Sequence, residues 1–158
     1  MSGLFWRALF AFIALPVTVA FVVPLLLRGR SEPALIGFPF LAAGTVLLLW
    51  CVRDFYVAGR GTLAPWAPPE RLVTVGLYRL SRNPMYVAVL LILFGWALTF
   101  PSWSLWVYTL CVAAAFQLRV VFFEEPWLAR THGAAWLAYR ARVPRWMRIN
   151  RARRESSE

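Results

Sequence analysis

The sequence predicts an all-α integral membrane protein with about four transmembrane helices and a C-terminal amphipathic helix at the membrane interface. Two observations lead to this prediction. The 158-residue chain is 61% hydrophobic with a mean hydropathy of +0.62, and so apolar a chain has too little polar surface to cover itself in water. Its net charge is nevertheless +10, which a membrane protein accommodates by confining charge to the ends of its spans. This composition excludes a disordered basic tail and a disulfide-rich secreted module, and it argues against an ordinary cytosolic enzyme.

Four apolar stretches supply the expected spans. A bilayer core about 30 Å thick needs roughly 20 helical residues, and backbone in lipid must satisfy its own hydrogen bonds, which favours helices. The stretches cover residues 8–27, 34–52, 85–100 and 104–123. A tight turn through residues 100–103 joins the third span to the fourth. We expect the prolines of the first two stretches to kink the helices rather than end them, at Pro16, Pro24 and Pro39.

The distribution of arginine predicts the orientation. All 17 basic residues are arginines; five lie in the segment 53–83, eight follow residue 123, and none lies in the turn between the third and fourth spans. The positive-inside rule then places the N-terminus, the middle loop and the C-terminus in the cytoplasm. We expect a bacterial inner (plasma) membrane and a bilayer rather than a nucleic acid as the partner of the basic residues. The oligomeric state stays open.

Cysteine and histidine give no sign of a metal site. Cys51 and Cys111 lie within spans at no metal-binding spacing, so we interpret both as reduced packing residues. The single histidine, His132, is interpreted as a packing residue rather than a base. No metal is therefore expected.

Polar residues gather at the cytoplasmic mouth of the third span. Pro84 suits the first position of a helix, because its missing N–H is not needed there, and Asn83 is then placed as the N-cap. Arg79, Arg82 and Tyr86 lie at the same mouth.

A second polar group lies where the fourth span ends. Gln117 and Glu124 are seven residues apart and share one helical face. Glu124 and the adjacent Glu125 point about 100° apart, so at most one is expected to aim into the bundle. We expect Pro126 to begin a new helix over 126–142, with the glutamates at its positive end. One side of that helix carries Leu128, His132, Ala135, Trp136 and Tyr139, a pattern typical of an interfacial amphipathic helix.

Each polar group also has a simpler interpretation. Arg79 and Arg82 fit ordinary positive-inside charges. Glu124 and Glu125 fit head-group-level carboxylates paired with arginine, and Arg119 fits a residue that snorkels to the interface. Gln117 and Arg119 inside a span nevertheless indicate a polar cavity or partner.

Two motifs together resemble a known family. Residues 76–86 read Gly-Leu-Tyr-Arg-Leu-Ser-Arg-Asn-Pro-Met-Tyr, and residues 124–145 follow Glu-Glu-x-x-Leu-x-x-x-His-Gly-x-x-Trp-x-x-Tyr-x-x-x-Val-Pro-Arg. The chain thereby resembles the isoprenylcysteine carboxyl methyltransferase family, which is related to the membrane phospholipid methyltransferases. The likeness runs from about Gly61 to Arg148. The family's members use S-adenosylmethionine bound at the cytoplasmic end of the last helices.

The resemblance implies roles for particular residues. Tyr78, Asn83, Tyr86, Glu124 and Glu125 would line the cofactor site, with Tyr139, Arg119 and Arg145 as further candidates. Arg82 would lie between cofactor and acceptor. The chain departs from the family pattern at Leu77 (usually Pro), Asn83 (usually His), His132 (usually Phe) and Trp136 (usually Tyr), and the substitution of His argues against a base at Asn83. It also lacks the Gly-x-Gly of the phospholipid methyltransferases.

The expected function is therefore methyl transfer from S-adenosylmethionine to a lipophilic acceptor at the cytoplasmic face. We expect residues 1–148 to form one domain and 149–158 a charged tail. If the acceptor is a carboxylate, Arg82 would hold it; if it is an amine, Glu124 would take its proton; a hydroxyl acceptor is also open. Arg82 and Glu124 are thus the expected catalytic residues. The alternative is a non-catalytic membrane scaffold or assembly factor that kept the fold.

Overall fold

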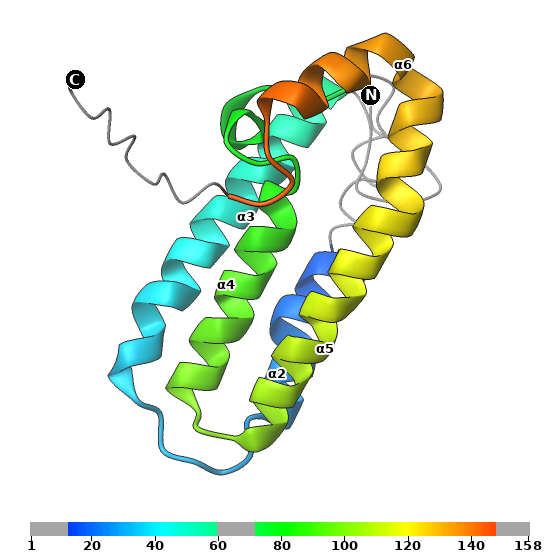
Figure 1. The fold of residues 1–158 in the computed structure, drawn as a ribbon. Coiled ribbons are helices and arrows are strands. Elements are labelled where there is room, and N and C mark those ends of the chain that lie inside the picture. Colours follow the sequence, from blue (N-terminus) through cyan, green and yellow to red (C-terminus); the bar gives the residue numbers. More distant parts are fainter. Residues whose placement is uncertain (1–12, 60–71, 148–158) are drawn as a thin grey trace, which may run out of the picture.

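The computed structural model describes residues 13–59 and 72–147, and within these ranges the chain is entirely helical, with no strand (Figure 1). In order, the elements are η1 (Ile13–Val22), α2 (Val23–Leu27), η2 (Leu35–Gly37), α3 (Phe38–Gly59), η3 (Gly76–Arg79), α4 (Pro84–Thr99), α5 (Trp103–Arg119), η4 (Val120–Glu124) and α6 (Glu125–Arg142). η1 and η4 are π-helical, and η2 and η3 are short 3₁₀ turns. The all-helical prediction is confirmed for the described residues.

α4 is the central helix of the bundle. It packs against α3, α5 and η1, and its buried residues include Ala88, Ile92 and Leu93. The seam with α3 depends on glycine: a Cβ on Gly44 would lie 2.7 Å from an Ile92 side-chain carbon, and one on Gly95 would lie 2.7 Å from the backbone nitrogen of Leu41. Small residues at such positions allow two helix backbones to approach closely, as in membrane helix pairs. The α3–α4 pair therefore forms a fixed base from which the other helices are positioned.

The first helical segment is held through its backbone carbonyls. Pro16 lies inside η1 without ending it, as predicted. The Tyr108 hydroxyl donates to the Val19 carbonyl at 3.1 Å, and the Ser104 hydroxyl donates to the Leu27 carbonyl, which ends α2, at 3.0 Å. Side chains of α5 thus donate to one carbonyl of the π-helical η1 and to one at the end of α2, where the last carbonyls have no intrahelical N–H.

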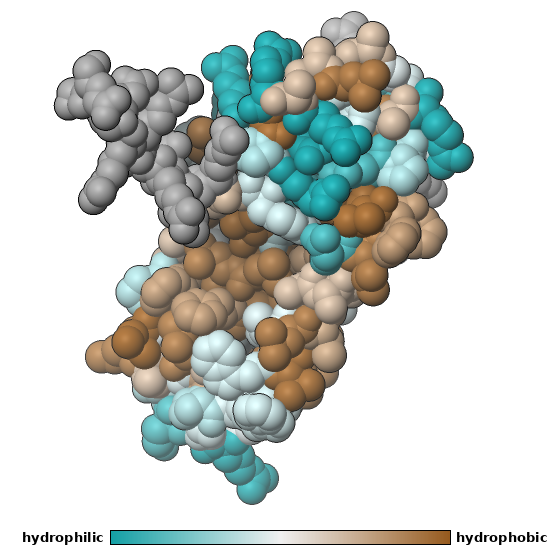
Figure 2. Space-filling view, viewed as in Figure 1, coloured by the Kyte–Doolittle hydropathy of each residue, from teal (hydrophilic) through white to brown (hydrophobic). Residues whose placement is uncertain are grey.

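The surface carries a hydrophobic band between two polar ends, as Figure 2 shows for one face. The exposed large side chains of this band include Val46 and Leu49 on α3 and Leu110 and Leu118 on α5. Two helices are long and apolar enough to cross a membrane, Leu35–Asp54 and the continuous Trp103–Arg142, while Pro16–Leu27 and Pro84–Thr99 are apolar but shorter. The two longer helices agree with the second and fourth predicted spans.

The last helix runs without a break from α5 through η4 into α6. α6 has nearly the predicted bounds of 126–142 and carries Pro126 in its first turn, but it continues η4 without a break, so the prediction of a separate helix is wrong in that respect. Glu124 has helical φ and ψ of −74° and −49°, so the glutamates do not lie at a free, positive helix end. The real interruption is Gly133, whose φ of 47° and ψ of −119° bend α6 sharply.

The bend directs the second half of α6 across the end of the bundle (Figure 1). It brings Trp136 and Tyr139 into a small core with Val143, against which Leu72 and Leu128 pack. Ala135, which we expected on the same side, is exposed, because the helical periodicity is broken at the glycine. Residues 8–12 of the first predicted span, the middle loop from 60 to 71 and the tail 149–158 lie outside the described residues.

Candidate active site

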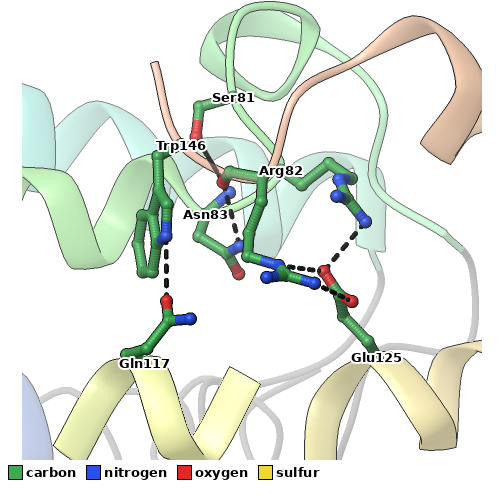
Figure 3. Close-up of polar contacts among 7 residues, drawn as sticks. Ser81, Arg82, Asn83, Gln117, Glu125 and Trp146 are labelled. Atoms are coloured by element: carbon green, nitrogen blue, oxygen red, sulfur yellow. Dashed lines mark hydrogen bonds and ion pairs between the residues drawn. The ribbon is translucent and has the colours of Figure 1, made fainter. Parts of the chain in front are cut away.

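The two sequence motifs meet at one end of the bundle. η3 and the start of α4 bring the first motif to this end, and η4, α6 and residues 143–147 bring the second. Figure 3 shows Ser81, Arg82 and Asn83 facing Glu125 and the segment that follows α6. The site is therefore built from two motifs whose nearest contacting members, Tyr86 and Glu124, are 38 residues apart in the chain.

Glu125 is the centre of a buried ion cluster. Arg145 donates two parallel hydrogen bonds to its carboxylate, from Nε to Oε1 at 2.7 Å and from Nη2 to Oε2 at 2.8 Å. Nη1 of Arg82 lies 2.9 Å from Oε1. The side chains of Arg82 and Glu125 are only 8% and 11% exposed, so the pair is largely withdrawn from water.

The environment shifts the pKa of both groups. Burial raises the pKa of Glu125, but the hydrogen bonds from Arg145 and the charge of Arg82 outweigh it, so the pKa lies below the usual range. Burial lowers the pKa of the Arg82 guanidinium, although the Glu125 carboxylate opposes that effect. The arrangement therefore favours a charged Glu125 at neutral pH.

Arg82 also lies over an aromatic ring. Its Cζ is 5.3 Å from the ring centroid of Trp136, a cation–π distance. Nε and Nη1 of Arg82 and Nε1 of Trp136 are buried and have no hydrogen-bond acceptor within the structure as described. The ion pair with Glu125 consequently leaves donor capacity on Arg82 unused.

The segment after α6 closes over the site as a strap, which we define as residues 143–147. Its backbone carbonyls accept hydrogen bonds from the first motif: Arg82 N donates to Pro144 O at 2.9 Å, and Ser81 Oγ and Asn83 Nδ2 each donate to Arg145 O at 3.1 Å. Trp146 Nε1 donates to Gln117 Oε1 at 3.0 Å (Figure 3). The strap is thus tied to the residues that precede α4 on one side and to α5 on the other.

Asn83 occupies the N-cap position of α4, but its side chain does not cap the helix. The amide donates instead to the strap at Arg145 O. The predicted N-cap position is thus confirmed, but no cap hydrogen bond forms: Nδ2 donates to the strap, and Oδ1 accepts no hydrogen bond from the first turn of α4.

Glu124 forms a second, more open cluster. Its Oε1 accepts hydrogen bonds from the Tyr86 hydroxyl and from Arg119 Nε, the latter at 2.8 Å. Arg119 Nε also lies 3.1 Å from the Tyr86 hydroxyl, and the Tyr86 ring stacks on Phe116 at a centroid distance of 4.2 Å. The side chains of Arg119 and Glu124 are 48% and 29% exposed. Oε2 of Glu124 takes part in none of these contacts.

Both glutamates therefore contact the mouth of α4, and the prediction that at most one aims into the bundle is wrong. The expectation overlooked that partners flank the helix on two sides: Tyr86 of α4 meets Glu124, whereas Arg145 of the strap reaches Glu125.

Tyr78 and Tyr139 join η3 to α6 beside the site. Both are buried, and the Tyr139 hydroxyl donates to the Tyr78 carbonyl at 2.7 Å. Burial raises the pKa of Tyr139 to about 12, so its hydroxyl stays a neutral donor at neutral pH. These contacts hold the 3₁₀ turn η3 against α6.

Arg79 and His132 lie outside the site, whereas two residues of the site, Ser81 and Trp146, were not predicted from the sequence. Arg79 is exposed to solvent, in line with an ordinary topological charge, and His132 contacts Trp127 edge to face without a hydrogen bond on Nε2 in the described part of the chain. Sequence reasoning did not find Ser81 or Trp146, since their partners lie on the strap and on α5. No group of metal-binding side chains occurs in the residues that the structure describes.

Comparison with known proteins gives one match. The sequence model of phospholipid methyltransferases matches residues 33–135, about two thirds of the chain. No curated protein and no solved structure matches the chain. The matched region contains the first motif and both glutamates and ends before the strap.

Proposed function

The chain belongs to the phospholipid methyltransferase family, and from that premise we propose that it transfers a methyl group from S-adenosylmethionine to a lipophilic acceptor at one face of the membrane. The observation that carries the proposal is the convergence of Arg82, Tyr86, Glu124 and Glu125 at one end of an apolar bundle, under a strap of chain. That end holds most of the charge-bearing side chains of the two motifs.

The residues present suit the cofactor's polar groups. The carboxylate of S-adenosylmethionine needs N–H donors, and Arg82 has buried donors without hydrogen-bond acceptors among the described residues. Its ammonium and ribose hydroxyls need acceptors, and Oε2 of Glu124 is unengaged by the contacts described above. We assign Asn83, Tyr78 and Tyr139 to the support of this site, through the strap and η3.

When bound, the cofactor supplies an electrophilic methyl group on a sulfonium. The chain's own task is then alignment and exclusion of water, because an in-line displacement mainly requires the reacting groups to be held in place. The strap covers the site, and the Arg145–Glu125 ion pair holds it down. Arg82, fixed over Trp136, positions an anionic group of a ligand.

Proton transfer depends on the acceptor. A carboxylate acceptor needs no base, whereas an amine or hydroxyl must lose a proton. Glu124 is the proposed base, since it is partly exposed and its Oε2 takes no part in the contacts with Tyr86 and Arg119. Glu125 is unsuited to that role, because two arginines neutralise it and the pKa of its carboxyl is lowered.

The membrane supplies the acceptor in this proposal. We propose four spans with both termini and the site on the cytoplasmic side, because arginines of both arginine-rich segments, among them Arg79, Arg82 and Arg145, lie at the site end in the described part of the chain. A lipophilic acceptor dissolved in the bilayer would reach the site from between the helices, where Phe122 and Phe123 of η4 are exposed.

Binding of S-adenosylhomocysteine to the purified protein in detergent tests the proposal. We expect a saturable rise in melting temperature, and labelled methyl transfer from S-adenosylmethionine into a native lipid extract. A folded protein that binds no S-adenosylhomocysteine at millimolar concentration would overturn the proposal. Binding without transfer to any extract would favour the non-catalytic scaffold instead.

A further inference from the structure

Three buried N–H donors near the site lack a hydrogen-bond acceptor in the described residues. They are Nε and Nη1 of Arg82 and Nε1 of Trp136. Nη1 lies within ion-pair distance of Glu125, but it makes no hydrogen bond there. A buried donor without an acceptor is costly, and native proteins contain few of them. Three such donors on two contacting residues therefore call for an explanation.

The donors belong to one small region. The guanidinium of Arg82 lies over the indole of Trp136, with Cζ 5.3 Å from the ring centroid. The Arg82 side chain is 8% exposed and Trp136 is 1% exposed. Because the two side chains are in contact and both are shielded from water, solvent does not satisfy the unused donors of either.

The same region carries more positive than negative charge. Arg82 and Arg145 share the single carboxylate of Glu125, and Arg140 is near enough to act on both Arg82 and Glu125 electrostatically. Among the described residues, this one carboxylate does not neutralise the set. An added anion would be stabilised by charge and by hydrogen bonds together.

We propose that Arg82 and Trp136 form a binding site for an oxyanion of a ligand, a carboxylate or a phosphate, with the Trp136 indole N–H as the second donor beside the guanidinium. The inference rests on the proposed function and deepens it, since the oxyanion belongs either to the cofactor's amino-acid end or to the acceptor. Trp136 is then a ligand-binding residue rather than only a packing residue.

Trp136→Phe removes the N–H donor and keeps an aromatic ring under Arg82. The probes are S-adenosylhomocysteine, which carries the carboxylate, and 5′-methylthioadenosine, which has the nucleoside and thioether without it. We expect the affinity for S-adenosylhomocysteine to fall about tenfold or more, the loss typical of a hydrogen bond to a charged group. The affinity for 5′-methylthioadenosine should stay unchanged. Trp103→Phe, at an exposed tryptophan on the far end of α5, is the matched control and should change neither.

The remaining outcomes separate the alternatives. Unchanged affinity for S-adenosylhomocysteine with a raised KM and an unchanged kcat for the lipid acceptor would assign the oxyanion to the acceptor. Equal losses for both probes, or no change in affinity and KM, would overturn the inference while the wild-type protein still supports the proposed function. Failure of the wild-type protein to bind S-adenosylhomocysteine would instead overturn the proposed function and this inference with it.

If Trp136→Phe does not fold, a binding measurement on the wild-type protein still tests the inference. Decarboxylated S-adenosylhomocysteine keeps the amine and loses only the carboxylate. We expect the wild-type protein to bind it at least tenfold more weakly than S-adenosylhomocysteine if the cofactor supplies the oxyanion. Equal binding, together with an acceptor that carries neither carboxylate nor phosphate, would overturn the inference.

Discussion

Glu124 and Glu125 are neighbours in the chain, yet they occupy opposite environments. Glu125 is 11% exposed and is neutralised by two arginines, one of them on the strap. Glu124 is 29% exposed, shares one oxygen with Tyr86 and Arg119, and has the other oxygen outside these contacts. The difference separates two tasks: Glu125 holds the strap and Arg82 in place, while Glu124 remains available to a ligand.

Glu124→Gln tests whether Glu124 acts as the base, and its effect on kcat should be the largest of the effects predicted here. For an amine or hydroxyl acceptor, loss of a general base lowers kcat by on the order of 100- to 10,000-fold. Labelled methyl transfer into the identified acceptor measures it. Glu32→Gln, at an exposed glutamate in the loop after α2, should leave kcat unchanged. A normal kcat in Glu124→Gln with such an acceptor would remove Glu124 as the base; with a carboxylate acceptor a normal kcat is expected.

Glu125→Gln tests whether the buried ion pair of Glu125 stabilises the folded protein. Arg82 would lose its counter-charge while staying buried, and breaking a buried ion pair in this way costs about 3–5 kcal/mol of the free energy of unfolding. Glu124→Gln breaks a partly exposed pair and should cost about 0–1 kcal/mol. Unfolding in detergent, followed by circular dichroism, measures both.

The double variant Arg82→Met with Glu125→Leu is the control for that prediction. It removes the buried charges together, so most of the stability lost in Glu125→Gln should return. A double variant as unstable as the single one would show that Glu125 acts by some means other than pairing with Arg82.

The stability that the charged Glu125 contributes should be lost gradually as the pH falls. The pKa of Glu125 is below its usual value of 4.5, so its charged form is stabilised in the folded state. That contribution is fully present above the unfolded pKa and is lost as the pH falls through the folded pKa. The stability difference between the wild-type protein and Glu125→Gln should therefore be constant from pH 7 to 5 and shrink below about pH 4.5. A difference that shrinks already between pH 7 and 6 would contradict the prediction.

Tyr139→Phe should lower the free energy of unfolding less than Glu125→Gln does. It leaves the Tyr78 carbonyl without the hydroxyl that now donates to it at 2.7 Å, and a lost buried hydrogen bond costs about 1–3 kcal/mol. Because burial raises the pKa of Tyr139 to about 12, the hydroxyl is neutral at ordinary pH, and the loss should be the same at pH 6 and pH 9. A loss that grows between these values would indicate that Tyr139 ionises.

Much of the helical layout was predictable from the sequence. Length and hydropathy alone predicted a helix over 85–100, and α4 runs from Pro84 to Thr99. The turn between α4 and α5 also lies where Pro101 and Ser102 indicated it. Such features depend on local composition, which a single sequence contains in full.

The errors concern contacts between distant segments and irregular helix geometry. Asn83 has the residue type of an N-cap, but the Arg145 carbonyl, 62 residues away, takes its amide. The path of the strap also decides the surroundings of the two glutamates, because it carries Arg145 to Glu125 while Tyr86 meets Glu124. Ser81 and Trp146 were missed because only the path of the strap gives them partners.

The bend at Gly133 decides how far the last helix reaches. Without it, the 40 residues from Trp103 to Arg142 would form a straight rod about 60 Å long, roughly twice the thickness of a bilayer core. No atom lies within 4 Å of a Cβ added at Gly133 in the described structure, so the space is free and only the backbone angle demands glycine. Gly133→Ala would therefore strain the bend rather than create a clash, and this strain opposes the contacts that hold Trp136 and the strap beside Arg82. The bend at Gly133 thus places the part of the helix that exceeds the bilayer thickness across the end of the bundle, over the site.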